Sequence, residues 1–150
     1  MSHFQRGAAL QEAGNFAAAE QAYQAALAID PTLAPVYNAL GGLYAAWERP
    51  VEAVSFYQQA TQLAPETAEF WRNLGIVQAN QGEMSAAVAA LERAIALTPE
   101  DAMLYYEVGQ MYAFWQRPQK ARQAFGRVLG LTADESLAAA AMAQLRLLPP

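Results

Sequence analysis

The sequence predicts an all-α protein, an α-solenoid in which antiparallel helix pairs stack one upon the next. Glycine and alanine columns recur every 34 residues without exception, at Gly7, Gly41, Gly75 and Gly109 and at Ala19, Ala53, Ala87 and Ala121. Within each period the apolar residues follow the spacing of two helices. A fixed period of this length indicates stacked repeats, because each unit buries its apolar face only against its neighbours.

One domain spanning 1–150 accommodates this pattern, with an apolar fraction of 55% that is ample for a core. The repeats are expected at about 1–33, 34–67, 68–101 and 102–135, and a final capping helix at 136–148.

The first repeat begins with residues at capping-box spacing, Ser2 and Gln5. Between its two helices, Gly14 predicts the left-handed residue that ends the first one. The second repeat has no glycine there, and Pro50 instead predicts the start of its second helix. Proline fits the first turn of a helix and disfavours helical geometry at the preceding Arg49.

The same alternation of glycine and proline recurs in the third and fourth repeats. Thr67 and Asp101 are expected to cap their first helices. Gly82 then takes the role of Gly14, and Pro118 takes that of Pro50.

The capping helix continues in register, because Met142 falls in the Leu40 column and Ala143 in the glycine column. Pro149 and Pro150 end it.

Glycine inside a helix costs roughly 1 kcal/mol relative to alanine, so its presence in every repeat requires a reason. Without a side chain, it lets the second helix approach closely. The motif Trp47-Glu-Arg-Pro50 returns as Trp115-Gln-Arg-Pro118, twice the period further on. This rhythm indicates a duplicated pair of repeats, with both tryptophans as packing residues near the turns.

Composition argues against several functional classes. A net charge of −5 with nine basic residues argues against a nucleic-acid binder that neutralises phosphates. The chain has no cysteine and a single His3, which leaves little for a metal site or a catalytic triad. We expect no enzyme activity, catalytic residue, metal or cofactor. No signal peptide or apolar run of about 18 residues is present, so a soluble cytoplasmic protein is expected, and the composition suggests a bacterium.

The spacing Tyr37-x-x-Leu40-Gly41-x-x-Tyr44, followed by Ala53-x-x-x-Tyr57, resembles the tetratricopeptide repeat. The resemblance implies a right-handed superhelix whose first helices line a concave groove. It also implies a non-enzymatic scaffold for protein–protein interactions.

The residues that we expect to bind a partner peptide or helix lie on that inner face: Phe4, Asn38, Glu69, Arg72, Asn73, Asn80, Tyr106, Glu107, Gln110 and Phe114. Arg72 is the expected contact for a partner carboxylate. The alternative interpretation is a solvated surface without a binding role. The family's clamp for a chaperone's C-terminal carboxylate is not expected, because only Asn73 matches its lysine, asparagine and arginine positions.

Two further hypotheses remain. The capping helix is unusually apolar, so Leu137, Leu147 and Leu148 are candidates for self-association into a homo-oligomer. Alternatively, the chain is a regulatory segment of a larger protein.

Overall fold

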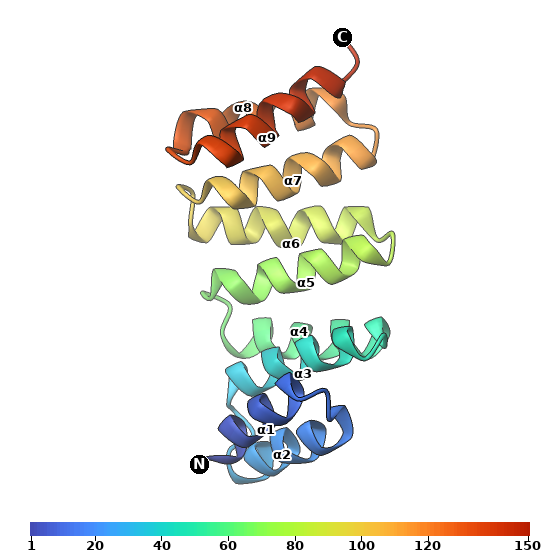
Figure 1. The fold of residues 1–150 in the computed structure, drawn as a ribbon, viewed down its shortest axis with the longest axis vertical. Helices are drawn as coiled ribbons and strands as arrows, with labels where there is room; N and C mark the ends of the chain where they lie inside the picture. The colour runs from blue at the N-terminus through green and yellow to red at the C-terminus, as the bar shows by residue number, and fades with distance from the viewer.

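The computed structural model describes residues 1–150 as nine α-helices and no strand, so the predicted all-α class is confirmed. Their bounds are α1 His3–Glu12, α2 Phe16–Ile29, α3 Ala34–Ala46, α4 Pro50–Leu63, α5 Ala68–Asn80, α6 Met84–Leu97, α7 Ala102–Phe114, α8 Pro118–Leu131 and α9 Glu135–Leu147. The helices stack in chain order from α1 and α2 at one end to α9 at the other (Figure 1). None of them is both long and apolar enough to cross a membrane.

The glycine column is where the two helices of a repeat meet. A methyl group at Gly7 or Gly41 would lie 2.6 Å from the ring of Tyr23 or Tyr57. At Gly109 the distance to the Phe125 ring would be 2.8 Å. The expected reason for the glycines is therefore confirmed, and the group that needs the space is an aromatic ring.

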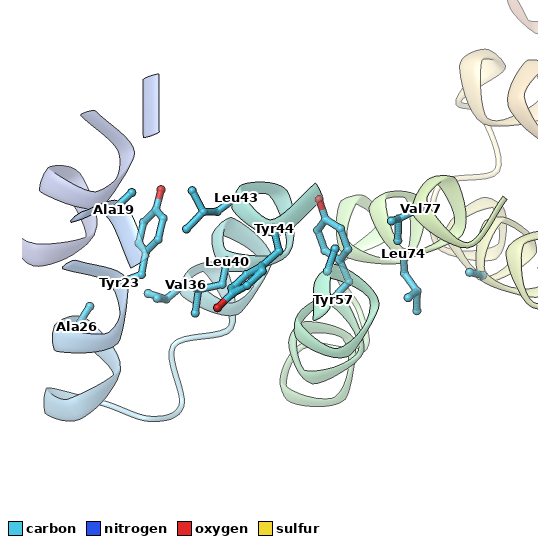
Figure 2. Packing of buried hydrophobic residues seen from close by; sticks show 12 residues of the cluster. Ala19, Tyr23, Ala26, Val36, Leu40, Leu43, Tyr44, Tyr57, Leu74 and Val77 are labelled. Atoms are coloured by element: carbon cyan, nitrogen blue, oxygen red, sulfur yellow. The ribbon is translucent and has the colours of Figure 1, made fainter. Parts of the chain in front are cut away.

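Buried side chains form two main clusters. The N-terminal cluster comprises Ala19, Tyr23, Ala26, Val36, Leu40, Leu43, Tyr44, Ala53, Tyr57, Leu74, Val77 and Ala90. Figure 2 shows it running from α2 through α3 and α4 to α5, and Ala90 adds a contact from α6. The C-terminal cluster comprises Val88, Leu91, Ala94, Leu104, Val108, Tyr112, Ala121, Ala124, Phe125, Val128 and Ala141. Trp71 packs against both clusters.

Helix capping follows the sequence at two of three expected sites. Ser2 and Gln5 form the capping box, and the Asp101 carboxylate accepts from the backbone N–H of Met103 at 3.0 Å. The prediction for Thr67 is wrong, because its side chain bonds no helix donor. The N–H of Phe70, which a capping hydroxyl would take, donates instead to the Thr67 carbonyl at 3.1 Å.

All four turns inside the repeats contain a left-handed residue at the same position. Gly14 and Gly82 have φ of 74° and 81°, and Glu48 and Gln116 have φ of 58° and 56°. In each turn the residue that follows donates to a carbonyl five positions earlier, at 2.8 to 2.9 Å. Pro50 and Pro118 start their helices as predicted, but they do not replace the left-handed residue. The same helix ending is therefore built with glycine in two repeats and with a strained residue in the others.

The two tryptophans beside these turns pack as predicted. Trp47 is half-buried, with its ring centre 5.9 Å from those of Phe16 and Tyr44. The Arg49 guanidinium lies 4.7 Å from the Tyr44 ring centre. Trp115 packs on the C-terminal cluster, with the guanidinium of Arg117 at 4.9 Å. Each arginine thus covers the rings at its turn.

Two tyrosines that lie 68 residues apart are anchored by carboxylates. The Tyr44 hydroxyl donates to Glu20 at 2.5 Å, and the Tyr112 hydroxyl donates to Glu92. Between them, Gln78 takes the corresponding place in the third repeat. It is buried, and its Oε1 has no hydrogen-bond partner.

The turns predict opposite effects of reciprocal substitutions. Glu48→Gly and Gln116→Gly should each stabilise the fold by about 1 kcal/mol, because a side chain at positive φ is strained. Gly14→Ala and Gly82→Ala should each destabilise it by about 1 kcal/mol, although the added methyl group would meet no atom within 4 Å. Urea denaturation measures all four. As a control, Gly126→Ala on α8 also meets no atom within 4 Å, and it should stabilise by about 1 kcal/mol. A destabilising Glu48→Gly would contradict the prediction.

Tyr112 predicts a loss of stability at high pH. Burial, together with the hydrogen bond to Glu92, raises the pKa of Tyr112 from 10.0 to about 12. As the pH rises, the unfolded chain therefore loses this proton first, and the free energy of unfolding falls between about pH 10 and about pH 12. Tyr112→Phe removes the group and should flatten this part of the curve relative to wild type. Urea unfolding across the range checks it, and identical slopes for the two proteins would refute it.

Candidate functional site

The candidate site is the first-helix face, the surface formed by side chains of α1, α3, α5 and α7 that point away from the second helices. Polar side chains join neighbouring helices across it. The Asn73 amide donates to the Asn38 Oδ1 at 2.9 Å. The Arg72 Nε lies 3.0 and 2.9 Å from the two carboxylate oxygens of Glu107, and Nη2 lies 2.5 Å from Oε1. Both pairs join residues 35 apart, so contacts between repeats advance by one position relative to the sequence period.

The ion pair changes the role expected of Arg72. Its guanidinium is held by both oxygens of Glu107, and the pKa of Arg72 is raised, chiefly by this hydrogen bonding. The Arg72 side chain remains 40% exposed, so the pair is in solvent contact and contributes no more than about 1 kcal/mol to stability. A partner carboxylate at Arg72 would have to displace Glu107.

Between α5 and α7 the face contains an open hollow of about 480 Å³. Its lining is Ile76, Ala79, Asn80, Met84, Glu107, Gln110, Met111 and Phe114. We call it the C-terminal hollow. The Phe114 ring at its edge is 75% exposed, which is unusual for a phenylalanine in a folded repeat.

A second hollow of about 580 Å³ lies at the other end of the face, where Ala8, Gln11, Glu12, Gly14, Phe16, Tyr23 and Ala46 line it. We call it the N-terminal hollow. Five of its positions match the C-terminal hollow at a spacing of 68 residues: Ala8 with Ile76, Gln11 with Ala79, Glu12 with Asn80, Phe16 with Met84 and Ala46 with Phe114. The two hollows are therefore equivalent places two repeats apart.

The structure brings together only part of the predicted set. Asn80, Glu107, Gln110 and Phe114 line the C-terminal hollow, whereas the remaining residues lie outside both hollows. Phe4 packs against Tyr23 at 5.9 Å between ring centres, and Tyr106 packs against Phe125 at 5.7 Å. Glu69 is exposed in the first turn of α5. Phe4 and Tyr106 occupy equivalent places three repeats apart, and Tyr106 extends the core, whereas Phe4 stays 37% exposed.

Sequence reasoning missed two methionines in the C-terminal hollow. Met111 falls in the column of Leu43 and Val77, which are both buried, so it reads as a core residue. Met84 falls in the column of Pro50 and Pro118. The replacement of a rigid proline by a flexible apolar side chain was the signal that could have identified it.

The basic residues of α8, which are Lys120, Arg122 and Arg127, lie on the second-helix side of the stack, and two of them contact aromatic rings. Lys120 lies 5.3 Å from the Tyr112 ring centre, and Arg127 lies 5.9 Å from that of Tyr105. Arg122 donates to the Pro149 carbonyl at 2.7 Å. These contacts hold the cations against the protein, so they serve local packing as well as charge.

The two hollows offer apolar surface and hydrogen-bonding groups. Their linings are apolar groups, amides and carboxylates, with one phenol at Tyr23, whose hydroxyl donates to Gln11 at 2.9 Å. Neither is lined by serine, histidine or lysine. No cluster of three or more histidine, aspartate or glutamate residues in the chain has the arrangement to hold a metal ion.

The fold is shared with several solved structures. The MamA protein is 27% identical, with 97% of this chain and 78% of that chain covered at a TM-score of 0.84. PilF of Pseudomonas aeruginosa is 26% identical, with coverage of 95% and 65% at a TM-score of 0.82. A repeat protein from Parabacteroides merdae has a TM-score of 0.86 at 20% identity, with 96% and 57% covered, which shows likeness of fold alone. No curated protein matches the sequence.

Three family models match successive parts of the sequence, and each is described as a tetratricopeptide repeat. They match residues 1–66, 40–103 and 80–136. Together the matches cover all four helix pairs. The chain belongs to the tetratricopeptide repeat family.

Proposed function

We propose that this chain holds one segment of a partner protein across its first-helix face, with one anchor side chain in each hollow. Repeats of this family form protein–protein interaction scaffolds that are typically non-catalytic, and this chain has such repeats throughout. The observation that carries the finer proposal is the pair of equivalent hollows 68 residues apart.

The linings indicate what the anchors are. The C-terminal hollow offers Ile76, Met84, Met111 and Phe114, which suits a bulky apolar side chain. Methionine side chains adapt their shape, so this hollow accepts more than one kind of anchor. The N-terminal hollow is floored by Ala8 and Ala46 and edged by Phe16, and it suits an apolar anchor as well.

Charge adds a second requirement. Each hollow is lined by one carboxylate, Glu12 or Glu107, and by no cation. Arg72 already balances the charge of Glu107, so a basic residue beside the anchor complements the N-terminal hollow at Glu12, whereas an acidic residue there is repelled. Between the hollows, the amides of Asn38 and Asn73 lie where an extended backbone would cross, and amides can bond both its N–H and its C=O groups.

Phe114 provides the first test. Peptides selected from a random display library on the wild-type protein should lose about tenfold in affinity with Phe114→Ala, because an exposed aromatic at a hollow is a typical anchor contact. Ile29→Ala is the matched control, since Ile29 on α2 is 76% exposed against 75% for Phe114 and lies off the face. Isothermal titration calorimetry measures both. Equal affinity for wild type and Phe114→Ala would refute the proposal.

Glu107 provides the second test. Peptides selected on wild type should show no enrichment of acidic residues beside the anchor of the C-terminal hollow, because Arg72 and Glu107 neutralise each other. Glu107→Gln removes the carboxylate and releases Arg72, so the same library should then yield peptides enriched in aspartate or glutamate. Glu66→Gln, in an exposed loop, removes one carboxylate elsewhere and should leave the selected charges unchanged. An unaltered charge preference in Glu107→Gln would contradict the assignment.

A further inference from the structure

In every repeat, the second helix covers one face of the first helix. The corresponding face of α9 is open to solvent. Met142 is 44% exposed, whereas Leu40, Leu74 and Val108 in the same column are 1 to 4% exposed. Ala139, Ala143 and Arg146 are exposed beside it. The opposite side of α9 packs inward through Ala141, Leu137, Leu145 and Leu148.

The three residues that the sequence analysis suggested for self-association differ in their exposure to solvent. Leu137 and Leu148 pack against the C-terminal cluster, and only Leu147, 78% exposed, is open to solvent. Any partner of α9 therefore meets a different set of side chains, centred on Met142.

The occupant differs from the second helices of this chain. Those helices place a ring against a glycine, where a methyl group would lie 2.6 to 2.8 Å from ring atoms at Gly7, Gly41 and Gly109. In α9 that column holds Ala143, whose methyl group excludes such a ring. A helix on this face must pack through side chains at a larger separation.

The exposed face has the spacing of a helix-pairing seam. Glu135, Ala139, Met142 and Arg146 follow one another at intervals of 4, 3 and 4 residues. The order is self-complementary when the helix is reversed: in an antiparallel pair, Glu135 lies opposite Arg146 and Ala139 lies opposite Met142. Both ends then carry an ion pair, and each methionine meets a small alanine.

We propose that the occupant is a second copy of this chain, which pairs through α9 about a two-fold axis. Such a two-fold contact is closed, so it gives a dimer and no larger assembly. One helix pair buries less than the roughly 1,000 Å² of a firm interface, so the dissociation constant is on the order of 100 µM.

Charge reversal tests the pairing and its register. Sedimentation velocity of the full chain from about 1 µM to about 1 mM should show a monomer–dimer equilibrium. Glu135→Arg or Arg146→Glu places like charges opposite each other twice and should weaken the dimer about tenfold or more. The double variant Glu135→Arg/Arg146→Glu restores opposite charges and should recover the wild-type constant within about threefold. Circular dichroism confirms that each variant is folded.

Met142→Glu should abolish the dimer, whereas Met103→Glu on α7, a methionine of nearly equal exposure at 42%, should not. Because the chain has no cysteine, single cysteines can report the register directly. When Ala139→Cys and Met142→Cys are mixed and oxidised, the mixed disulfide should form faster than either symmetric one, as judged by intact mass.

A monomer at every concentration would overturn the proposal and would assign the α9 face to a helix of different sequence. A dimer that survives Met142→Glu, or a double charge reversal that fails to recover it, would overturn the surface or the register. Growth beyond the dimer would exclude the two-fold arrangement.

Discussion

The contact between a first-helix glycine and a second-helix ring sets how closely each pair packs, and the rest of the stack depends on it. At Gly7, Gly41 and Gly109, ring atoms occupy the space in which a side chain would begin. Gly75 faces Leu91 instead, with an added methyl group 3.1 Å from its Cγ. Alanines on the second helices complete the fit, since Ala19, Ala53, Ala87 and Ala121 are all fully buried. Because the two helices of a repeat lie this close together, the next helix pair can pack on them without leaving a cavity.

A two-repeat rhythm is superimposed on this common packing. In the second and fourth repeats, tryptophan precedes the left-handed residue and arginine and proline follow it, whereas glycine fills that position in the first and third. The two anchored tyrosines, Tyr44 and Tyr112, and the two hollows keep the same spacing. This rhythm is the one that led us to the hypothesis of a duplicated pair of repeats, which stays a prediction. Phe114 and Ile76 place larger apolar side chains in one hollow than Ala46 and Ala8 do in its counterpart.

The sequence predicted the features that repeat within one unit and missed those that arise between units. The helices and the glycine contacts follow from columns 34 residues apart. The pairs Asn38–Asn73 and Arg72–Glu107 lie 35 apart, because adjacent first helices pack with a shift of one position. Alignment by the sequence period places the members of each pair in different rows. The positive φ of Glu48 was not predicted for a different reason. Neighbouring hydrogen bonds impose this backbone conformation, and a glutamate side chain does not indicate it.

The division of the core into two clusters affects how the protein unfolds. Contacts in a stacked repeat are local, so its parts can unfold in separate steps when the link between them is weak. Here Trp71 packs against both clusters and thus bridges the two halves. Its indole N–H donates to the Pro65 carbonyl at 2.8 Å, which fixes the ring between them. Trp71 therefore couples the two ends of the chain together with α6, which carries Ala90 of the N-terminal cluster and Leu91 of the C-terminal cluster. Loosening of this junction lets the amide hydrogens of each half exchange separately.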